Sequence, residues 1–263
     1  MTLVDMFKET TIVSNKNPLI GKPYGKTVGL AILAYNAPIT TEASIRNHQS
    51  HGLYQFFDDV VVCFQCATDD DVAMAKRCGV RYVTREDNLG IQGGFRWAWE
   101  TLKTDYILIL ENDIPVCVSN EVLEAQLKQS LRLLVQKKVD LVRLRNRFNP
   151  GEQNRFASMY SRFWPVHCQD SRWRHTERLS TAPNWLKALR RFCRPGKAIR
   201  WCGRSPYIEQ HPDKLFPNYI EVIEPDFFCV DSWVLPWTNQ ATLLSKNLMG
   251  MLLDYADAHK TRH

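Results

Sequence analysis

The chain has 263 residues and a net charge of +6, and 44% of the residues are apolar, which is ordinary for a globular core. This size suits one large domain, and the composition excludes a chain too polar to fold. No apolar run approaches the roughly 18 residues of a membrane helix, and the first thirty residues lack the blocks of a signal peptide, so we expect a cytoplasmic protein with reduced cysteines.

Strand and helix patterns alternate through the first half of the chain. Residues 1–26 read as an irregular lead-in, and Thr27 to Tyr35 is a nearly continuous apolar run, as expected for a strand buried on both faces of a parallel sheet. Thr40 or Thr41 can cap the helix that follows, and Thr68 can cap the second helix. Further strands are predicted at 59–66, 80–84 and 106–111, with a third helix at 88–102. This alternation with short connections predicts a right-handed parallel α/β sheet.

The second half departs from this alternation. A helix is predicted at 120–138 and a strand at 140–144, and periodicity then breaks down over residues 145–217, where Trp residues are interspersed with Arg, Pro and Gly. We interpret this stretch as a loop-rich substrate region. Strand patterns return at 219–223 and 226–234, and a helix is predicted at 245–259.

Positive charge is concentrated in the middle of the chain. Residues 143–204 hold thirteen Arg and two Lys against three acidic residues, an excess of +12, which leaves about −6 for the remainder. Such asymmetry suggests an acidic partner, for which phosphate, anionic lipid headgroups and acidic glycans are candidates. A solvated basic face is the alternative, and the sequence leaves both open.

Polar residues stand at the end of each of the first four predicted strands. Tyr35 and Asn36 end the first, Gln65 the second and Arg85 the third, and the fourth, YILILENDIPV, runs into Glu-Asn-Asp at 111–113. The carboxyl ends of parallel strands share one edge of a sheet, and ligands of open α/β sheets bind there. We therefore expect these residues to converge on one rim.

The acidic strand end has a spacing that suits a metal. Glu111 and Asp113 are two residues apart on what we expect to be extended chain, so their side chains point to the same side and Asn112 faces the other way. Hard divalent cations take oxygen ligands, and Mg²⁺ commonly uses one or two carboxylates together with substrate phosphates. The alternative is a strand end that is simply capped by polar residues.

A glycine-rich stretch, NLGIQGGFRWA at 88–98, precedes the acidic strand DYILILEND at 105–113. Together they resemble glycosyltransferases of the GT-A fold, especially those of family 2, with Glu-Asn-Asp in place of the DxD motif of that family. The resemblance covers roughly Val28 to Val116. It implies a GT-A-type, Rossmann-like α/β fold with a mostly parallel sheet flanked by helices. The implied organisation is a nucleotide-sugar-binding half at 27–142 and a loop-rich, Arg- and Trp-containing acceptor-binding half of the same domain at 143–263.

The resemblance also implies roles for single residues. Asp113 is the direct ligand of a Mn²⁺ or Mg²⁺ cofactor, and Glu111 contacts the donor ribose or a metal-bound water. Gln65 stands where family 2 enzymes commonly carry an Asp that reads uracil, which leaves the identity of the base open. The residues assigned to the nucleotide sugar are Ala34, Tyr35, Asn36, Gln65, Arg85, Asn88, Gly90, Gly93, Glu111 and Asn112.

Sugar transfer with inversion needs a base that deprotonates the acceptor hydroxyl. Three carboxylates in the aromatic-rich segment IEPDFFCVDSWVLPW are candidates, namely Glu224, Asp226 and Asp231. We choose Asp231, because the apolar residues on both sides of it in the sequence would desolvate its carboxylate and raise its pKa. A structural carboxylate bonded to the backbone is the alternative.

The sequence thus predicts a metal-dependent, inverting glycosyltransferase that moves a sugar from a nucleotide-diphosphate donor to a glycan, lipid or protein acceptor. Peripheral contact with an anionic membrane or an acidic acceptor is a further expectation, and no nucleic-acid partner is expected. A nucleotidyltransferase is one alternative, although it would usually carry a Gly-rich basic loop where this chain has Asn36-Ala-Pro. A catalytically silent module that binds an anionic polymer is the other.

Overall fold

The computed structural model describes residues 20–144, 212–225, 227–232 and 241–259, together with Trp185, Leu189 and residues 192–195. The chain forms two compact units, one made of residues 1–145 and 239–263 and the other of residues 146–238. We describe each unit by itself. Among the described residues, no helix combines the length and the apolar character needed to cross a membrane.

The first unit is built on a six-stranded sheet with the strand order β3-β2-β1-β4-β8-β5. The strands β3, β2, β1 and β4 run parallel, and β8 is antiparallel to both of its neighbours. The predicted α/β fold with a mostly parallel sheet is confirmed. The bounds are Val28–Tyr35 for β1, Asp59–Gln65 for β2, Tyr82–Thr84 for β3, Tyr106–Glu111 for β4, Leu141–Arg143 for β5 and Thr242–Ser245 for β8.

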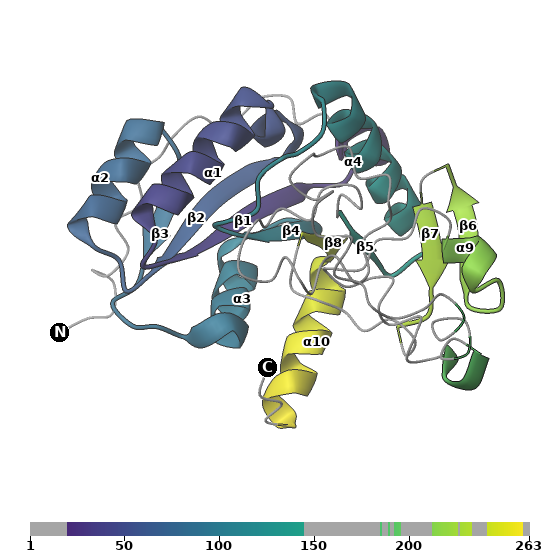
Figure 1. Cartoon of the computed structure of the whole chain (residues 1–263). Helices are drawn as coiled ribbons and strands as arrows, with labels where there is room; N and C mark the ends of the chain where they lie inside the picture. Colours follow the sequence, from purple (N-terminus) through teal and green to yellow (C-terminus); the bar gives the residue numbers. More distant parts are fainter. Residues whose placement is uncertain are drawn as a thin grey trace. The chain divides into compact units, whose positions relative to one another are not determined.

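Helices cover both faces of this sheet (Figure 1). On one face lie α1 (Pro38–Ser50), α2 (Asp69–Cys78) and α4 (Asn120–Val135), and on the other lie α3 (Gly90–Thr101) and α10 (Lys246–Ala258). The carboxyl edge of the parallel strands is the edge where α/β folds bind ligands. Two short 3-10 helices complete the unit, η1 at Lys22–Tyr24 and η2 at Leu53–Phe56.

The central strands form the core because both of their faces are apolar. Every residue of β1 except Tyr35 is buried, and so are the four central residues of β4, Ile107 to Leu110. A fully buried Leu or Ile side chain contributes about 1.5–3 kcal/mol relative to an exposed one. This burial on both faces is why the two strands appear in the sequence as continuous apolar runs.

Two helix starts were predicted from capping residues, with different outcomes. Thr68 caps α2 in a capping box, as predicted. The predicted cap at Thr40 or Thr41 is wrong, because α1 begins earlier at Pro38, whose fixed φ suits the first helical position. Thr41 lies inside the helix, where its hydroxyl donates a hydrogen bond to the Ala37 carbonyl at 2.8 Å.

The C-terminal strand and helix belong to the first unit. β8 lies between β4 and β5, and α10 packs against α3. Arg96 pairs with Asp254 at 2.9 Å, and the Trp99 indole N–H donates to the Lys246 carbonyl at 2.8 Å. The division of the chain at residues 142 and 143 stays a prediction, since most of residues 145–240 lies outside the described part.

The described part of the second unit contains a β-hairpin and a short helix. β6 (Ile220–Glu224) pairs antiparallel with β7 (Phe227–Val230), and α9 (Pro212–Leu215) precedes them. Buried Phe216 and Ile220 form the centre of a small apolar cluster beneath the hairpin. The loop-rich region predicted at 145–217 lies almost entirely outside the described residues.

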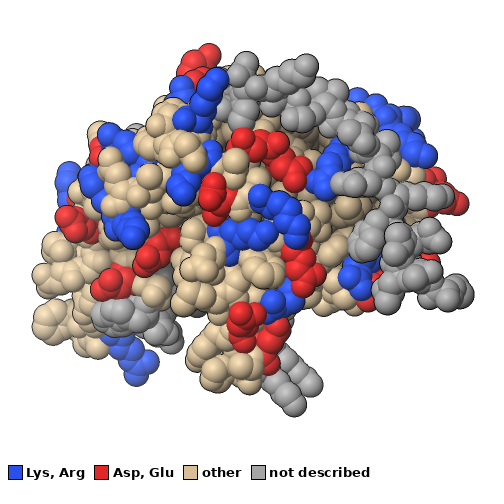
Figure 2. Space-filling view, turned by 180° about the vertical axis from the view of Figure 1, so that it is seen from behind, with Lys and Arg blue, Asp and Glu red and all other residues tan. Residues whose placement is uncertain are grey.

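The described surface carries charges of both signs. Figure 2 shows Lys and Arg side chains interspersed with Asp and Glu side chains over one face of the molecule. Most of the positive excess counted at 143–204 falls on residues outside the described part. The basic region predicted from the sequence therefore stays a prediction.

Candidate functional site

Four parallel strands end at the same edge of the sheet. Tyr35 of β1 lies opposite Gln65 of β2, and Leu33 of β1 lies opposite Glu111 of β4. The last residue of β3, Thr84, lies opposite the residue before Gln65. The convergence of the strand ends on one rim is therefore as predicted.

The acidic stretch after β4 is a turn and not extended chain. β4 ends at Glu111, and the Ile114 amide donates a hydrogen bond to the Glu111 carbonyl at 3.3 Å, which closes a turn over Asn112 and Asp113. Pro115 follows and has no N–H to continue a ladder. The expectation that Glu111 and Asp113 share one side of an extended segment is therefore wrong.

The turn directs its two central side chains differently. The Asn112 amide donates to the Thr41 hydroxyl oxygen of α1 at 3.0 Å, so this side chain faces the helix. Asp113 is exposed, and among the described residues no hydrogen bond or ion pair engages its carboxylate. Glu111 is half-buried at the strand end. Asp113 is thus the acidic side chain of the triplet that is most open to a ligand.

The chain between β3 and α3 makes a tight turn at this edge. The Asn88 side-chain oxygen accepts a hydrogen bond from the Gly90 amide at 2.8 Å, and Gly90 has a φ of 67°, which favours glycine. Gly93 lies in the first turn of α3, where a Cβ would come within 2.6 Å of the Leu89 Cβ. The two glycines that were predicted to form the turn therefore open the helix.

The start of α3 is electrostatically unlike the start of α2. α2 opens with three acidic residues and a capping box, whereas α3 has no acidic residue in its first turn and no cap from its N-cap residue Leu89. Among the described residues, only the Gly90 amide of this turn has a side-chain partner, Asn88. The first amide groups of a helix lack partners within the helix and attract anions. The start of α3 is therefore suited to a phosphate group.

Gln65 is a buried support of the turn before α3. Its side chain is 6% exposed, and its Oε1 accepts a hydrogen bond from the Leu89 amide at 2.8 Å. A Cβ at position 94 would lie 2.9 Å from the Gln65 Nε2, so Gly94 makes room for this amide. The base-reading role assigned to Gln65 stays a prediction. Its hydrogen bond to the turn before α3 is a structural role that the sequence did not indicate.

The end of β1 exposes two polar side chains at the rim. Tyr35 is 48% exposed, and Asn36 follows it with a left-handed φ of 46°, which Asn adopts more readily than most residues. Ala34 is buried within the sheet, so its side chain belongs to the core. Tyr35 and Asn36 are therefore the side chains that β1 offers to a ligand.

Residues 30–194, more than half of the chain, match the model of Glycosyl transferase family 2. The chain belongs to this family. Membership and the observed sheet together confirm the predicted GT-A-type fold.

Solved structures resemble this family 2 glycosyltransferase only distantly, and no curated protein matches it. Glucosyl-3-phosphoglycerate synthase from Mycobacterium tuberculosis, in complex with phosphoglyceric acid, has 17% identity over 51% of this chain and 48% of that chain, with a TM-score of 0.38. Mannosyl-3-phosphoglycerate synthase from Rubrobacter xylanophilus has 16% identity over 50% of this chain and 44% of that chain, with a TM-score of 0.38.

A third structure is the mannosyltransferase PcManGT from Pyrobaculum calidifontis in complex with GDP-Man and Mn²⁺. Its identity is 15% over 47% of this chain and 37% of that chain, with a TM-score of 0.38. The family 2 chain spans about half or less of the length of these three structures. Likenesses this distant do not transfer an activity.

In this family 2 glycosyltransferase, Arg85 lies at the rim with a partner of its own. Its Nε is 2.9 Å from the Asp87 Oδ1, and its guanidinium carbon is 5.8 Å from the centroid of the Trp97 ring of α3. The hydrogen bond from Arg85 holds the pKa of the Asp87 carboxyl below its usual value. A phosphate group at Arg85 would therefore compete with Asp87.

The donor set at the rim fits a divalent cation that is shared with phosphate. Among the described residues, no group of three or more His, Cys, Asp or Glu side chains could hold a metal by itself. Mg²⁺ and similar hard cations are commonly bound by one or two carboxylates plus substrate phosphates. The exposed Asp113 carboxylate fits such a site, in which the diphosphate supplies further oxygen ligands.

The three carboxylates predicted as candidate bases belong to the second unit. Glu224 is half-buried at the end of β6, Asp231 is exposed just after β7, and Asp226 lies outside the described residues. The expectation that apolar neighbours desolvate Asp231 is therefore wrong, because the hairpin ends before this residue and leaves it exposed. Its role as the base stays a prediction.

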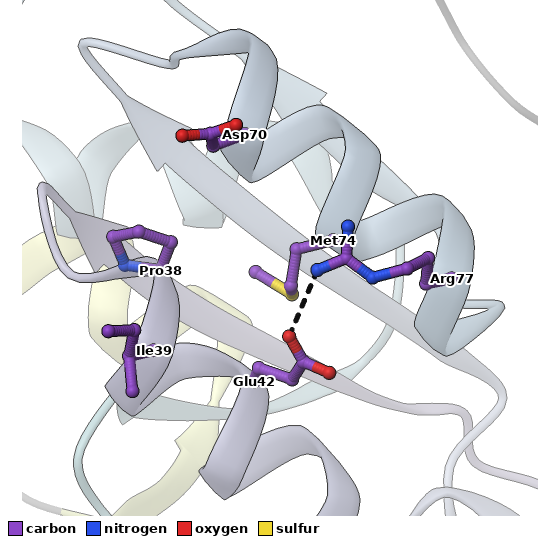
Figure 3. Close-up of a pocket in the computed structure, with 6 residues that line it drawn as sticks. All are labelled: Pro38, Ile39, Glu42, Asp70, Met74 and Arg77. Carbon is purple, nitrogen blue, oxygen red and sulfur yellow. Dashed lines mark hydrogen bonds and ion pairs between the residues drawn. The ribbon is translucent and has the colours of Figure 1, made fainter.

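A hollow of about 190 Å³ lies between α1 and α2 (Figure 3). Across it, Arg77 of α2 pairs with Glu42 of α1 at 3.1 Å. None of the residues assigned to the nucleotide sugar lines it, although Pro38 follows Asn36 by two residues. The lining residues are Pro38, Ile39, Glu42, Asp70, Met74 and Arg77.

Replacing Gln65 by Ala is expected to loosen the turn before α3. The Leu89 amide would lose its partner, so we expect the free energy of unfolding to fall by about 1–3 kcal/mol and nucleotide affinity to fall with it. Urea unfolding measures the first effect, and titration with a nucleoside diphosphate measures the second. Gln49→Ala is the matched control, because the Gln49 amide also donates to a backbone group, the Cys78 carbonyl at 2.7 Å, and Gln49 has no assigned role at the rim. Equal losses of nucleotide affinity in both variants would contradict the support role.

Proposed function

We propose that this family 2 glycosyltransferase transfers a sugar from a nucleotide-diphosphate sugar to a hydroxyl acceptor, with Mn²⁺ or Mg²⁺ as cofactor and with inversion at the transferred carbon. The observation that carries the proposal is the rim of the sheet. There the exposed Asp113 carboxylate, the start of α3 with no acidic residue in its first turn, and the exposed end of β1 lie at one edge. These features supply partners for a cation, for phosphate and for a nucleoside.

The diphosphate of the donor is assigned to the Asp113 turn and the start of α3. Asp113 would hold the divalent cation, which when bound neutralises negative charge on the leaving diphosphate. The amide groups that follow Gly90 in the first turn of α3 would donate to phosphate oxygens, since the Gly90 amide is bonded to Asn88. Arg85 would add a guanidinium when phosphate displaces Asp87. All of these partners become more favourable as charge grows on the leaving oxygen.

The nucleoside of the donor is assigned to the end of β1. The exposed Tyr35 ring offers an apolar face to a base or a ribose, and Asn36 offers an amide beside it. Gln65 lies at the next strand end, but its Oε1 already accepts the Leu89 amide. Tyr35, Asn36 and the Gln65 Nε2 would therefore recognise the nucleoside base.

The acceptor is assigned to the second unit, where Asp231, Asp226 and Glu224 are the candidate bases. The acceptor oxygen would attack the anomeric carbon as the bond to the diphosphate breaks, and the carboxylate would take the hydroxyl proton. Attack from the side opposite the diphosphate inverts the configuration at that carbon. The acceptor class is a glycan, a lipid or a protein hydroxyl, and the positive excess at 143–204 would favour an acidic one.

A screen of nucleotide sugars for hydrolysis tests this function without knowledge of the acceptor, because water can replace the hydroxyl. We expect at least one nucleotide sugar to release its nucleoside diphosphate in the presence of Mn²⁺ or Mg²⁺, and none to do so with a chelator. Joining of a nucleoside triphosphate to a sugar phosphate, without such hydrolysis, would instead identify a nucleotidyltransferase.

A further inference from the structure

The turn that carries Asp113 is bound along one face of α1. The segment from β4 to α4 runs beside this helix (Figure 1), and residues 112, 114 and 116 each make hydrogen bonds with it. The three α1 side chains involved, Thr41, Asn47 and His48, are about two helical turns apart at most, and Thr41 and His48 are fully buried. The helix therefore holds a stretch of backbone that is separated from it by more than sixty residues in the sequence.

Asn47 binds Val116 as a neighbouring strand would. Its Oδ1 accepts from the Val116 amide at 2.7 Å, and its Nδ2 donates to the Val116 carbonyl at 3.2 Å. One side-chain amide thus satisfies both backbone groups of a residue that lies beyond the end of β4. These two hydrogen bonds fix the position of Val116, the last of the three residues that contact α1.

His48 binds the middle of the segment. Its Nε2 lies 2.7 Å from the Ile114 carbonyl oxygen, and its Nδ1 lies 3.3 Å from the Tyr54 hydroxyl of η2. A carbonyl only accepts, so Nε2 carries the proton and Nδ1 accepts from Tyr54. Burial lowers the pKa of His48 and outweighs the hydrogen bond to the Ile114 carbonyl, which acts in the opposite direction, so the ring is neutral and keeps this arrangement near pH 7.

Alternation along the segment leaves Asp113 pointing to solvent. Asn112, Ile114 and Val116 are half-buried against α1, whereas Asp113 and Pro115 between them are exposed. The contacts of Asn112, Ile114 and Val116 with α1 therefore determine that the Asp113 side chain faces solvent. Any loss of these contacts would change where the Asp113 carboxylate lies.

Thr41 connects the segment to the end of β1. Its hydroxyl accepts from the Asn112 amide at 3.0 Å and donates to the Ala37 carbonyl at 2.8 Å. Ala37 directly follows Asn36, which is assigned to the nucleoside. A chain of two hydrogen bonds thus joins the turn of Asp113 to the loop that carries Tyr35 and Asn36.

We propose that α1 sets the position of the metal-binding carboxylate, with Thr41, Asn47 and His48 as positioning residues that touch neither donor nor cation. This inference rests on the proposed function, because it assigns the α1 contacts to a cation held by Asp113. Groups that orient a metal ligand typically change metal affinity about 10- to 100-fold when they are removed. The hydrogen bonds from α1 hold the turn in place, and the turn thereby positions the Asp113 carboxylate for the cation.

The test is the Mn²⁺-dependent affinity of the full chain for a nucleoside diphosphate. His48→Leu and Asn47→Ala are each expected to weaken this affinity about 10- to 100-fold. His48→Gln is expected to restore most of it, because the glutamine Nε2 can donate to the Ile114 carbonyl. Gln49→Ala is the control on the same helix, since its hydrogen bond goes to Cys78 of α2, and it should bind like the wild type.

The outcomes separate this inference from the proposed function. Wild-type chain that shows no Mn²⁺-dependent nucleotide binding would overturn both. Wild-type binding that is lost in Asp113→Ala but unchanged in folded His48→Leu and Asn47→Ala would overturn only the role of α1. If His48→Leu does not fold, Asn47→Ala decides alone, because Asn47 is half-buried and its loss leaves the core intact.

Discussion

Replacement of Asp113 by Ala should abolish metal-dependent nucleotide binding, with a loss of affinity of about 100-fold or more. Removing the metal ligand itself should weaken binding at least as much as removing the α1 residues that position it. The expected cause is the loss of the exposed carboxylate from the turn after β4. Calorimetric titration of the chain with nucleoside diphosphates, with and without Mn²⁺, measures the effect. The free energy of unfolding should change little, because Asp113 is exposed.

Asp140→Asn is the matched control for this variant. Asp140 is an exposed carboxylate just before β5, and none of the assigned site residues lies next to it in the sequence. It should bind nucleotide as the wild type does. Unchanged affinity of Asp113→Ala with Mn²⁺ present would refute the assignment of the cation to this turn.

The second large effect is expected from Asp231→Asn. Loss of a general base typically lowers turnover about 100- to 10,000-fold, and we expect a decrease in this range. Nucleotide affinity should survive, because Asp231 is assigned to the acceptor. Initial rates of sugar transfer, once a donor is found by the hydrolysis screen, measure turnover, and the titration described above measures affinity.

Glu224→Gln and Glu221→Gln complete this experiment. Glu224 is the half-buried rival base on β6, and Glu221 is an exposed carboxylate on the same strand with no assigned role. A turnover loss confined to Asp231→Asn would support our choice. Full activity of Asp231→Asn together with a large loss in Glu224→Gln would move the role to Glu224, and Glu221→Gln should stay active in either case.

The parts of the fold that the sequence predicted are those with local causes. β1 and β4 are buried on both faces, so their apolar runs were visible without any tertiary information. Thr68 and the acidic residues after it are a local start signal, and α2 begins where they predicted. The parallel direction of β3, β2, β1 and β4 follows from the alternation of strand and helix, which was visible in the sequence.

The parts that the sequence did not predict depend on tertiary contacts. β8 is only four residues long, and its antiparallel place between β4 and β5 has no local signature. The start of α1 was misplaced because Thr40 and Thr41 match the cap pattern, whereas Pro38 fixes the first turn.

The candidate site also combines features that the sequence predicted and features that it did not. The acidic triplet and the glycine-rich turn were visible in the sequence because both lie at strand ends that a periodic pattern defines. The turn at Glu111 is closed by a local bond from the Ile114 amide, and it was missed because the strand was assumed to stay extended through Asp113. The burial of Gln65 was not visible, since it goes with a hydrogen bond to the distant residue Leu89. The contacts of His48 and Asn47 with the acidic segment belong to the same class.

The central claim is a donor site at the rim that needs both a divalent cation and a nucleoside diphosphate, and thermal unfolding of the full chain tests it most directly. Ligands that bind only the folded state raise the unfolding temperature. We predict a rise when Mn²⁺ and a nucleoside diphosphate are present together, no rise with either alone, and no rise for Asp113→Ala. An equal rise with nucleotide in the presence of a chelator, or a response only to polyanions that salt removes, would contradict the account.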